Sequence, residues 1–286
     1  MRYAAESDRP RRRWGQNFLV NEGAADAMVR AFSPRPGDHV LEIGPGRGVL
    51  TRRMAGRVAR LVAVEIDSAL ASALSGSLPP SLPSGAFEVI WGDVLAIDPG
   101  ELLDRLGATD DSPGRVIANL PYNIATAVIL RLLTLRPRLS DLMVMVQREV
   151  AGRIAARPGS KAYGSLSILC QTLARVDSIL RLGPGSFHPR PRVDSEVIRL
   201  VLRDPGGAAG RDFEGYAVLV RAAFAARRKT LGNNLAVLPS PDGALGHANA
   251  TALLRSAGID PGRRGEEISV ERFQALFEAW QDRCGL

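Results

Sequence analysis

Apolar and β-branched residues gather in short runs along much of the chain, and stretches with helical spacing separate these runs. The pattern extends from Asp38 to about Val201. Alternation of short strands with helices is typical of βαβ units, which build a mostly parallel sheet. The runs predict seven strands, at His39–Ile43, Arg60–Glu65, Phe87–Trp91, Arg115–Ala118, Leu142–Val146, Ser178–Leu182 and Val193–Leu202. A helix is expected over Ala125–Leu135, where apolar residues dominate without strand-like alternation.

The pattern changes after residue 203. Residues 204–210, Asp-Pro-Gly-Gly-Ala-Ala-Gly, combine breakers with small residues and predict a linker. The remaining chain has three helical patterns and no strand signal, at Asp212–Arg228, Ala244–Ala257 and Ser269–Asp282. We therefore predict a basic N-terminal arm at residues 1–14, an α/β domain at 15–203 and a small all-α domain at 211–286.

The composition is that of a globular protein. Of 286 residues, 45% are hydrophobic and 23% are charged, and a chain of this length can bury a core without disulfides. The two cysteines, Cys170 and Cys284, lie in no CxxC motif or Cys/His cluster, so no disulfide framework or metal site is expected. The best apolar stretch, Ala127–Leu135, is too short to span a membrane. The N-terminus lacks the apolar segment of a secretory signal, and we expect a cytoplasmic protein.

An excess of basic residues points to a polyanionic partner. Lys and Arg number 37 against 30 acids, which gives a formal net charge of +7. RNA contacts are expected from two clusters, Arg11, Arg12 and Arg13 in the arm, and Arg227, Arg228 and Lys229 in the helical domain. A solvated surface and a coding bias toward arginine remain alternative explanations.

Polar residues follow successive predicted strands. A glycine-rich turn with Gly44 and Gly46 follows the first strand, and it can bring backbone close to a ligand or simply serve packing. Glu65 ends the second strand, where an acid can accept from ribose hydroxyls or merely lie at the surface. Asp93 follows the third strand and could accept from the amine of an adenine. The carboxyl ends of parallel strands share one edge of the sheet, so these residues predict a ligand site there. The GxGxG spacing disfavours NAD.

The fourth strand ends in a segment that suits chemistry on an amine. Asn119 offers a side-chain carbonyl, Pro121 stiffens the turn, and Tyr122 can stack on a base. The exocyclic amine of adenine is a poor nucleophile because its lone pair is delocalised into the ring. Two acceptors that hold its hydrogens can restore a directed lone pair. Attack on a methyl sulfonium then depends mainly on proximity and orientation.

Six segments in order resemble one family. They are Gly15–Leu19 (GQNFL), Glu42–Gly46 (EIGPG), Asn119–Ile124 (NLPYNI), Gln147–Val150 (QREV), Gly159–Gly164 (GSKAYG) and Phe187–Ser195 (FHPRPRVDS). Together they resemble the ribosomal RNA small-subunit adenine N6,N6-dimethyltransferases, the KsgA or RsmA family. The resemblance runs from about Arg12 to the C-terminal helices.

This resemblance implies a Rossmann-like class I methyltransferase fold with S-adenosylmethionine as methyl donor. It implies N6,N6-dimethylation of two adjacent adenines in the 3′-terminal hairpin of 16S rRNA, by a protein that acts on the small subunit as a monomer. The cofactor residues that it implies are Asn17, Leu19, Gly44, Gly46, Glu65, Asp93 and Asn119. The residues that it places at the target base are Asn119, Leu120, Pro121, Tyr122 and Phe187, with Tyr122 and Phe187 stacking on opposite faces of the base.

Three alternatives compete with this interpretation. The related large-subunit methyltransferases of the macrolide-resistance type share the fold, the cofactor and a similar motif at Asn119–Tyr122, whereas the segments Gln147–Val150 and Gly159–Gly164 favour the small-subunit enzyme. A ribosome-assembly factor that only binds RNA would not need an intact Asn119–Tyr122 segment. An NAD-dependent oxidoreductase is disfavoured by the glycine spacing.

Overall fold

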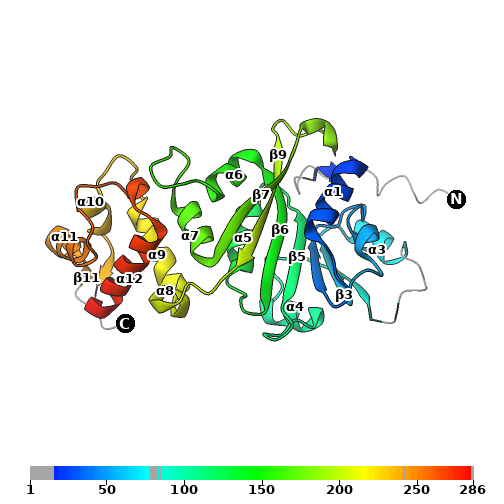
Figure 1. Cartoon of the computed structure of the whole chain (residues 1–286), viewed down its shortest axis with the longest axis horizontal. Helices are drawn as coiled ribbons and strands as arrows, with labels where there is room; N and C mark the ends of the chain where they lie inside the picture. Colours follow the sequence, from blue (N-terminus) through cyan, green and yellow to red (C-terminus); the bar gives the residue numbers. More distant parts are fainter. Residues whose placement is uncertain (1–15, 78–82, 84, 241–242, 285–286) are drawn as a thin grey trace. The chain divides into compact units, whose positions relative to one another are not determined.

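The computed structural model describes residues 16–77, 83, 85–240 and 243–284. These residues divide into two units, each with its own contacts. Unit 1 comprises residues 16–151 and 175–202, and unit 2 comprises residues 152–174 and 203–284. The two units are described separately below (Figure 1).

Unit 1 is built on a seven-stranded sheet. Its strands, in chain order, are β2 (His39–Ile43), β3 (Arg60–Glu65), β4 (Phe87–Trp91), β5 (Gly114–Asn119), β6 (Leu139–Gln147), β7 (Ala174–Leu182) and β9 (Ser195–Leu202). Their order across the sheet is β4-β3-β2-β5-β6-β9-β7. β2 to β6 pair in parallel, and β9 pairs with β6 in antiparallel fashion. The predicted fold class, a mostly parallel seven-stranded sheet with flanking helices, is confirmed.

Helices connect the parallel strands of unit 1. They are α2 (Thr51–Met54), α3 (Ser68–Ser75), α4 (Pro99–Leu106) and α5 (Ala125–Leu133). α1 (Glu22–Phe32) precedes the sheet, and α6 (Arg148–Ile154) includes residues of both units. Local sequence explains their ends. Asn21 caps α1 by accepting from the Ala24 N–H at 2.9 Å, and Asp67 caps α3. Gly107 ends α4 with a φ of 73°, a conformation that favours glycine.

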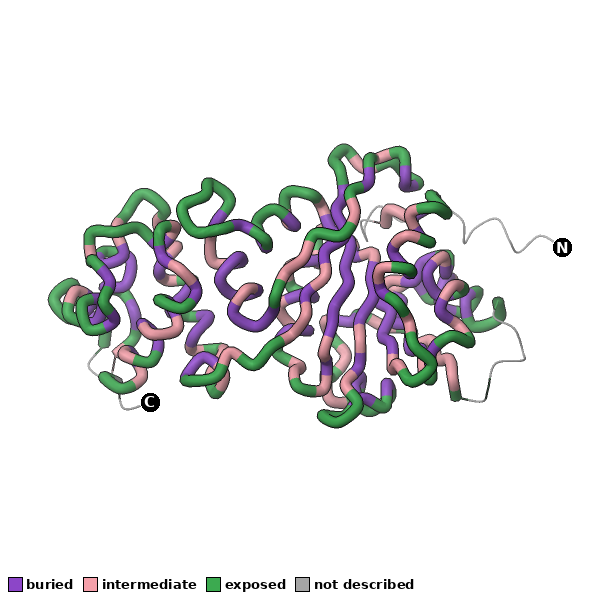
Figure 2. Tube along the Cα trace, viewed as in Figure 1, coloured by how far each residue is buried: buried purple, intermediate pink, exposed green. Residues whose placement is uncertain are grey.

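The core of unit 1 lies along the central strands, which are buried over most of their length (Figure 2). β3 contains an unbroken apolar run, Leu61–Val64, because both faces of a central parallel strand are covered. A two-stranded ribbon lies beside this sheet, in which β1 (Phe18–Leu19) pairs with β8 (Phe187–His188). The ribbon brings the N-terminal segment next to a motif that is distant in sequence.

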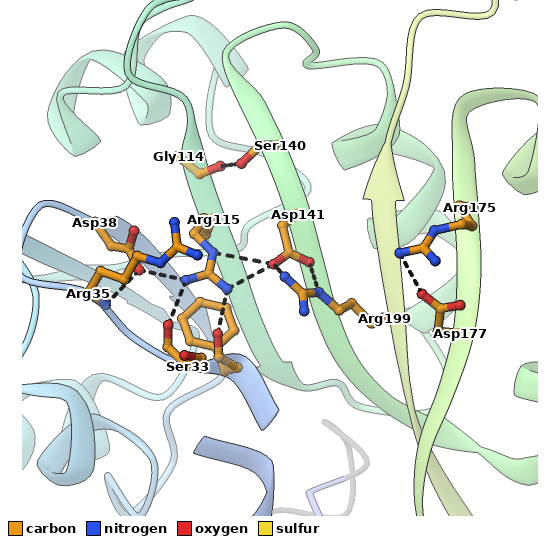
Figure 3. Close-up of polar contacts among 11 residues, drawn as sticks. Ser33, Arg35, Asp38, Gly114, Arg115, Ser140, Asp141, Arg175, Asp177 and Arg199 are labelled. Atoms are coloured by element: carbon orange, nitrogen blue, oxygen red, sulfur yellow. Dashed lines mark hydrogen bonds and ion pairs between the residues drawn. The ribbon is translucent and has the colours of Figure 1, made fainter. Parts of the chain in front are cut away.

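An ion-pair cluster joins β5, β6 and β9 near the amino ends of β5 and β6 (Figure 3). Asp141 on β6 accepts from Arg115 on β5 at 2.9 Å and from Arg199 on β9 at 2.6 Å. Arg115 also pairs with Asp38 at 2.5 Å and donates to the Phe32 carbonyl at the end of α1. The guanidinium of Arg115 lies 4.0 Å from the centre of the Phe32 ring. A buried aspartate is tolerated here because two arginines neutralise it and satisfy its oxygens. The cluster fixes α1 against the edge of the sheet opposite the predicted ligand site.

Unit 2 is mainly helical. Its elements are α7 (Ser165–Leu173), α8 (Gly207–Arg211), α9 (Phe213–Ala223), α10 (Leu231–Leu235), α11 (Gly246–Ser256) and α12 (Val270–Cys284), with short strands β10 (Pro239–Ser240) and β11 (Gly243–Ala244). Aromatic side chains form part of its core. The Tyr216 and Phe277 rings meet edge-on with centroids 5.5 Å apart.

The units differ from the predicted domains in two respects. Residues 152–174 group with the C-terminal helices rather than with the α/β domain expected at 15–203. The Thr172 hydroxyl lies 3.0 Å from the Tyr216 hydroxyl, and the Tyr163 hydroxyl donates to the Ile268 carbonyl at 3.0 Å. In addition, α8 begins at Gly207, so the linker expected at 204–210 is helical in its second half.

No helix among the described residues has both the length and the apolar character that a membrane span requires. The N-terminal arm expected at residues 1–14, including Arg11, Arg12 and Arg13, lies outside the described residues.

Candidate active site

A cavity in unit 1 lies at the carboxyl ends of β2, β3, β4 and β5. These strands are neighbours in the sheet, so their ends meet at one edge, as the sequence predicts. All seven residues expected to contact the cofactor line the cavity, together with three of the residues expected at the target base: Asn17, Leu19, Gly44, Gly46, Glu65, Asp93, Asn119, Leu120, Pro121 and Tyr122.

The glycine turn after β2 needs glycine for its backbone. Gly44 and Gly46 have φ values of 65° and 55°, in the left-handed region. A Cβ atom at position 46 would lie 2.9 Å from the ring of Phe18, so any side chain there would displace the N-terminal segment. The turn is therefore shaped to bring backbone close to whatever occupies the cavity.

Glu65 organises this edge of the sheet. Its side chain is 4% exposed, with Oε2 accepting from the Gly46 N–H and Oε1 from the Asp67 N–H, each at 3.0 Å. Burial raises the pKa of this carboxyl, while the two backbone donors oppose the shift. Each carboxylate oxygen has two lone pairs, so Glu65 can still accept from a ligand hydroxyl.

Asp93 lies at the start of the loop that follows β4. Its Oδ1 accepts from the Leu95 N–H at 2.9 Å, and no hydrogen bond of Oδ2 joins it to another described residue. The side chain is exposed and contributes to the cavity wall. One oxygen of Asp93 is therefore hydrogen-bonded to the loop, and the other can accept a hydrogen bond from a ligand.

Asn119 and Tyr122 are each tied to a segment distant in sequence. The Asn119 amide nitrogen donates to the Asn17 carbonyl at 2.9 Å, which leaves its side-chain oxygen as the acceptor. The Tyr122 hydroxyl lies 2.7 Å from the Ser195 hydroxyl, at the end of the Phe187–Ser195 motif. Burial raises the pKa of Tyr122, so its phenol stays protonated near neutral pH. Both side chains are held in defined orientations at the cavity.

Phe187 does not lie on the cavity wall. Its side chain is 2% exposed and belongs to the hydrophobic core together with Leu19, its partner across the β1–β8 ribbon. The structure thus places Phe187 in the core and not on the cavity wall. The stacking role toward the target base, which the resemblance implies, stays a prediction.

Sequence reasoning also missed residues that line the cavity, notably Phe18, Glu42 and Arg47. The guanidinium of Arg47 lies 5.0 Å from the centre of the Phe18 ring. Glu42 is buried within β2, and burial raises its pKa to about 7. A charged residue inside an apolar strand was the available signal for Glu42, because such a residue is rarely buried without a function or a partner.

The basic cluster expected to contact RNA lies in unit 2, between α9 and α10. All three side chains are exposed. Arg227 pairs with Glu266 at 3.0 Å and donates to the Lys161 carbonyl at 2.5 Å. Arg228 and Lys229, by contrast, form no ion pair or side-chain hydrogen bond with the residues that the structure describes.

Comparisons with known proteins agree with this geometry. A family model described as ribosomal RNA adenine dimethylase matches residues 7–282. The chain is 44% identical over 271 residues to ribosomal RNA small subunit methyltransferase A from Geobacter sulfurreducens, covering 94% of each chain. It is 41% identical to the protein of the same name from Syntrophotalea carbinolica, covering 96% of this chain and 97% of that one.

Two crystal structures have a similar fold. A dimethyladenosine transferase from Plasmodium falciparum matches with a TM-score of 0.75 and 23% identity over 94% of this chain and 98% of that one. The 23S rRNA methyltransferase ErmE matches with a TM-score of 0.64 and 26% identity over 92% of this chain and 99% of that one. The family model spans nearly the whole sequence, and the relatives do so at more than 40% identity. The chain therefore belongs to the ribosomal RNA adenine dimethylase family.

Proposed function

We propose that this protein transfers methyl groups from S-adenosylmethionine to N6 of two adjacent adenines in the 3′-terminal hairpin of 16S rRNA. The observation that carries the proposal is the orientation of Asn119. Asn119 lines the cavity, and its amide nitrogen donates to the Asn17 carbonyl at 2.9 Å, which leaves its side-chain oxygen as the acceptor. An amine that must be held by its hydrogens needs an acceptor at this position.

The cavity suits the methyl donor. The turn at Gly44 and Gly46 gives a close backbone approach for the methionine end, Glu65 accepts from the ribose, and Asp93 accepts from the adenine amine. When bound, S-adenosylmethionine supplies an electrophilic methyl group on a sulfonium. Leu19 and Asn17 close the cavity from the side of the N-terminal segment.

The protein's part in the reaction is to orient the target base. The Asn119 oxygen and the Leu120 carbonyl accept the two amine hydrogens, which directs the nitrogen lone pair toward the donor. Tyr122 stacks on the base, and its bond to Ser195 fixes the position of its hydroxyl. No strong general base is needed, because the amine proton becomes acidic once the nitrogen has attacked.

Two surfaces are suited to the RNA backbone. Arg228 and Lys229 are exposed and have no acidic partner among the described residues. In unit 1, the exposed Arg190 and Arg192 lie in the loop between β8 and β9. That loop is joined to the cavity wall at both ends, through the pairing of His188 with Phe18 and through the Tyr122–Ser195 bond.

The identities of the relatives favour the small subunit as substrate. Proteins named small subunit methyltransferase A reach 44% identity, against 26% for ErmE, which is named for 23S rRNA. A substrate of this kind supports a location in the cytoplasm, where the subunits assemble. The groups proposed to orient the target base, Asn119, Leu120 and Tyr122, all line one cavity of a single chain. A second copy is not needed to complete this site, which supports action as a monomer.

The experiment that tests the proposal is methylation of undermethylated small subunits with radiolabelled S-adenosylmethionine, followed by mapping of the modified bases. We expect label in two adjacent adenines of the 3′-terminal hairpin, none in large subunits, and none with the Asn119→Ala variant. Label in large subunits alone would identify the protein as a large-subunit enzyme. Label elsewhere in 16S rRNA would refute the proposed target.

A further inference from the structure

The loop that carries Asp93 is held by a side chain from α5. Arg131 donates from Nη1 to the Leu95 carbonyl and from Nη2 to the Ile97 carbonyl, the latter at 2.5 Å. Among the described residues, no acidic side chain pairs with Arg131. Its guanidinium therefore serves the backbone of this loop.

The two residues that Arg131 holds are two of the three whose N–H groups donate to Asp93. The Leu95 N–H donates to Asp93 Oδ1 at 2.9 Å, and the Ile97 N–H donates to the Asp93 carbonyl at 3.1 Å. Leu95 and Ile97 thus each accept from Arg131 through the carbonyl and donate to Asp93 through the N–H. The third donor is Ala96, whose N–H donates to the Asp93 carbonyl at 2.9 Å. This N–H shares a peptide group with the Leu95 carbonyl, so the bond from Arg131 to that carbonyl strengthens the bond from Ala96 to Asp93.

Arginine is suited to this role by its shape. The guanidinium is planar and can direct two parallel N–H groups at two acceptors, whereas an ammonium group acts as a point charge. Arg131 also lines a small apolar cavity together with Leu102 of α4 and Val128 of α5. Its orientation is fixed by the two hydrogen bonds to the loop.

We propose that Arg131 is a positioning residue for recognition of the donor's adenine ring, acting through Asp93. The inference rests on the proposed function, which assigns the Asp93 carboxylate to the adenine amine. Arg131 keeps the loop in the conformation that commits Oδ1 to Leu95 and leaves Oδ2 for the ligand. α5, which bears Arg131, begins shortly after the Asn119–Tyr122 segment. The bonds from Arg131 to the loop therefore also fix the position of the donor's adenine relative to the target-base site.

The test compares two ligands that differ only in the adenine amine. S-Adenosylhomocysteine and its purine analogue without the exocyclic amine are titrated calorimetrically into the full-length protein. We expect the wild type to bind the adenine form about ten- to a hundredfold more tightly, as is typical of a hydrogen bond to a charged acceptor. Arg131→Met, which keeps the aliphatic packing, should reduce this preference to about threefold or less while the analogue binds as before. Arg131→Lys should give an intermediate preference.

The matched control is Arg138→Met. Arg138 also donates to a backbone carbonyl, that of Ala108 at 2.9 Å, and pairs with Asp104, but it lies at the opposite edge of the sheet. This variant should keep the full preference. Retention of the full preference by both Arg131 variants, or an equal loss of affinity for both ligands, would overturn the proposal.

A second variant separates this inference from the proposed function. Asp93→Ala should abolish the preference, and adding Arg131→Met to it should cause no further loss. If the wild type itself does not distinguish the ligands, the Asp93 assignment and the role of Arg131 both fail, while the subunit methylation assay judges the proposed function independently.

Discussion

The buried Glu42 carboxyl should make the stability of unit 1 depend on pH. Its side chain is 1% exposed, and its Oε2 has no hydrogen-bond partner among the described residues. Burial is the main cause that raises its pKa to about 7, and the nearby Glu65 carboxylate adds to the effect, whereas Thr51 opposes it. In an unfolded chain the same carboxyl titrates at its ordinary value of 4.5.

The sign and size of the effect follow from proton linkage. Between pH 4.5 and 7 the folded protein holds a proton on Glu42 that the unfolded chain has released, so stability falls as pH rises through this window. One pKa unit corresponds to roughly 1.4 kcal/mol. At pH 8 the ionised Glu42 therefore costs the folded state about 3 kcal/mol, and at pH 5 it costs less than about 1 kcal/mol.

The perturbation is Glu42→Gln, which keeps the shape of the side chain and removes its titration. Urea unfolding of both proteins from pH 5 to 8.5 gives the difference in free energy of unfolding. We expect this difference to shift in favour of the variant by about 2–3 kcal/mol as pH rises from 5 to 8. A constant offset from the buried amide does not affect the slope. A difference that stays flat with pH would refute a buried, proton-holding Glu42.

Three further predictions concern the cofactor, the RNA surface and the core. Glu65→Ala should weaken S-adenosylmethionine binding by about 1.5–3 kcal/mol, and unchanged affinity in a calorimetric titration would remove Glu65 from the site. Neutralising Arg228 and Lys229 together should reduce the slope of log affinity against log salt, for small-subunit binding, by up to the value of about two phosphate contacts. Arg227→Ala should change this slope less, because Arg227 is already paired with Glu266. Equal slopes for all variants and wild type would argue against an RNA contact. Phe187→Ala should destabilise the protein by about 3–5 kcal/mol in urea unfolding, and an unaltered unfolding midpoint would contradict its place in the core.

The sheet could be predicted from sequence because its strands are short apolar runs bounded by turn residues. The bounds of β2, β3 and β4 coincide with the prediction. β6 begins earlier than predicted, at Leu139 rather than Leu142, since Ser140 and Asp141 interrupt the apolar run. Asp141 can lie inside the sheet only because Arg115 and Arg199 neutralise it. Such a long-range cluster leaves no local signal.

The cavity at one edge of the sheet could also be predicted, for a geometric reason. Parallel strands place their carboxyl ends together, so polar residues that follow them must converge whatever the details of packing. The partners of those residues could not be predicted. The bond from Asn119 to the Asn17 carbonyl and that between Tyr122 and Ser195 join segments that are far apart in sequence.

The position of Phe187 depends on strand register, which the local sequence does not determine. In the observed register Leu19 lies opposite Phe187 in the core, while Phe18 lies opposite His188 with its ring against Gly46 at the cavity. Side chains alternate between the two faces of a strand, so a shift of one residue would exchange these environments. A strand of two residues contains too few positions to reveal an alternating pattern. The proline-rich sequence after Phe187 indicates a loop near the site, but the pairing with Leu19 is what turns this aromatic ring toward the core.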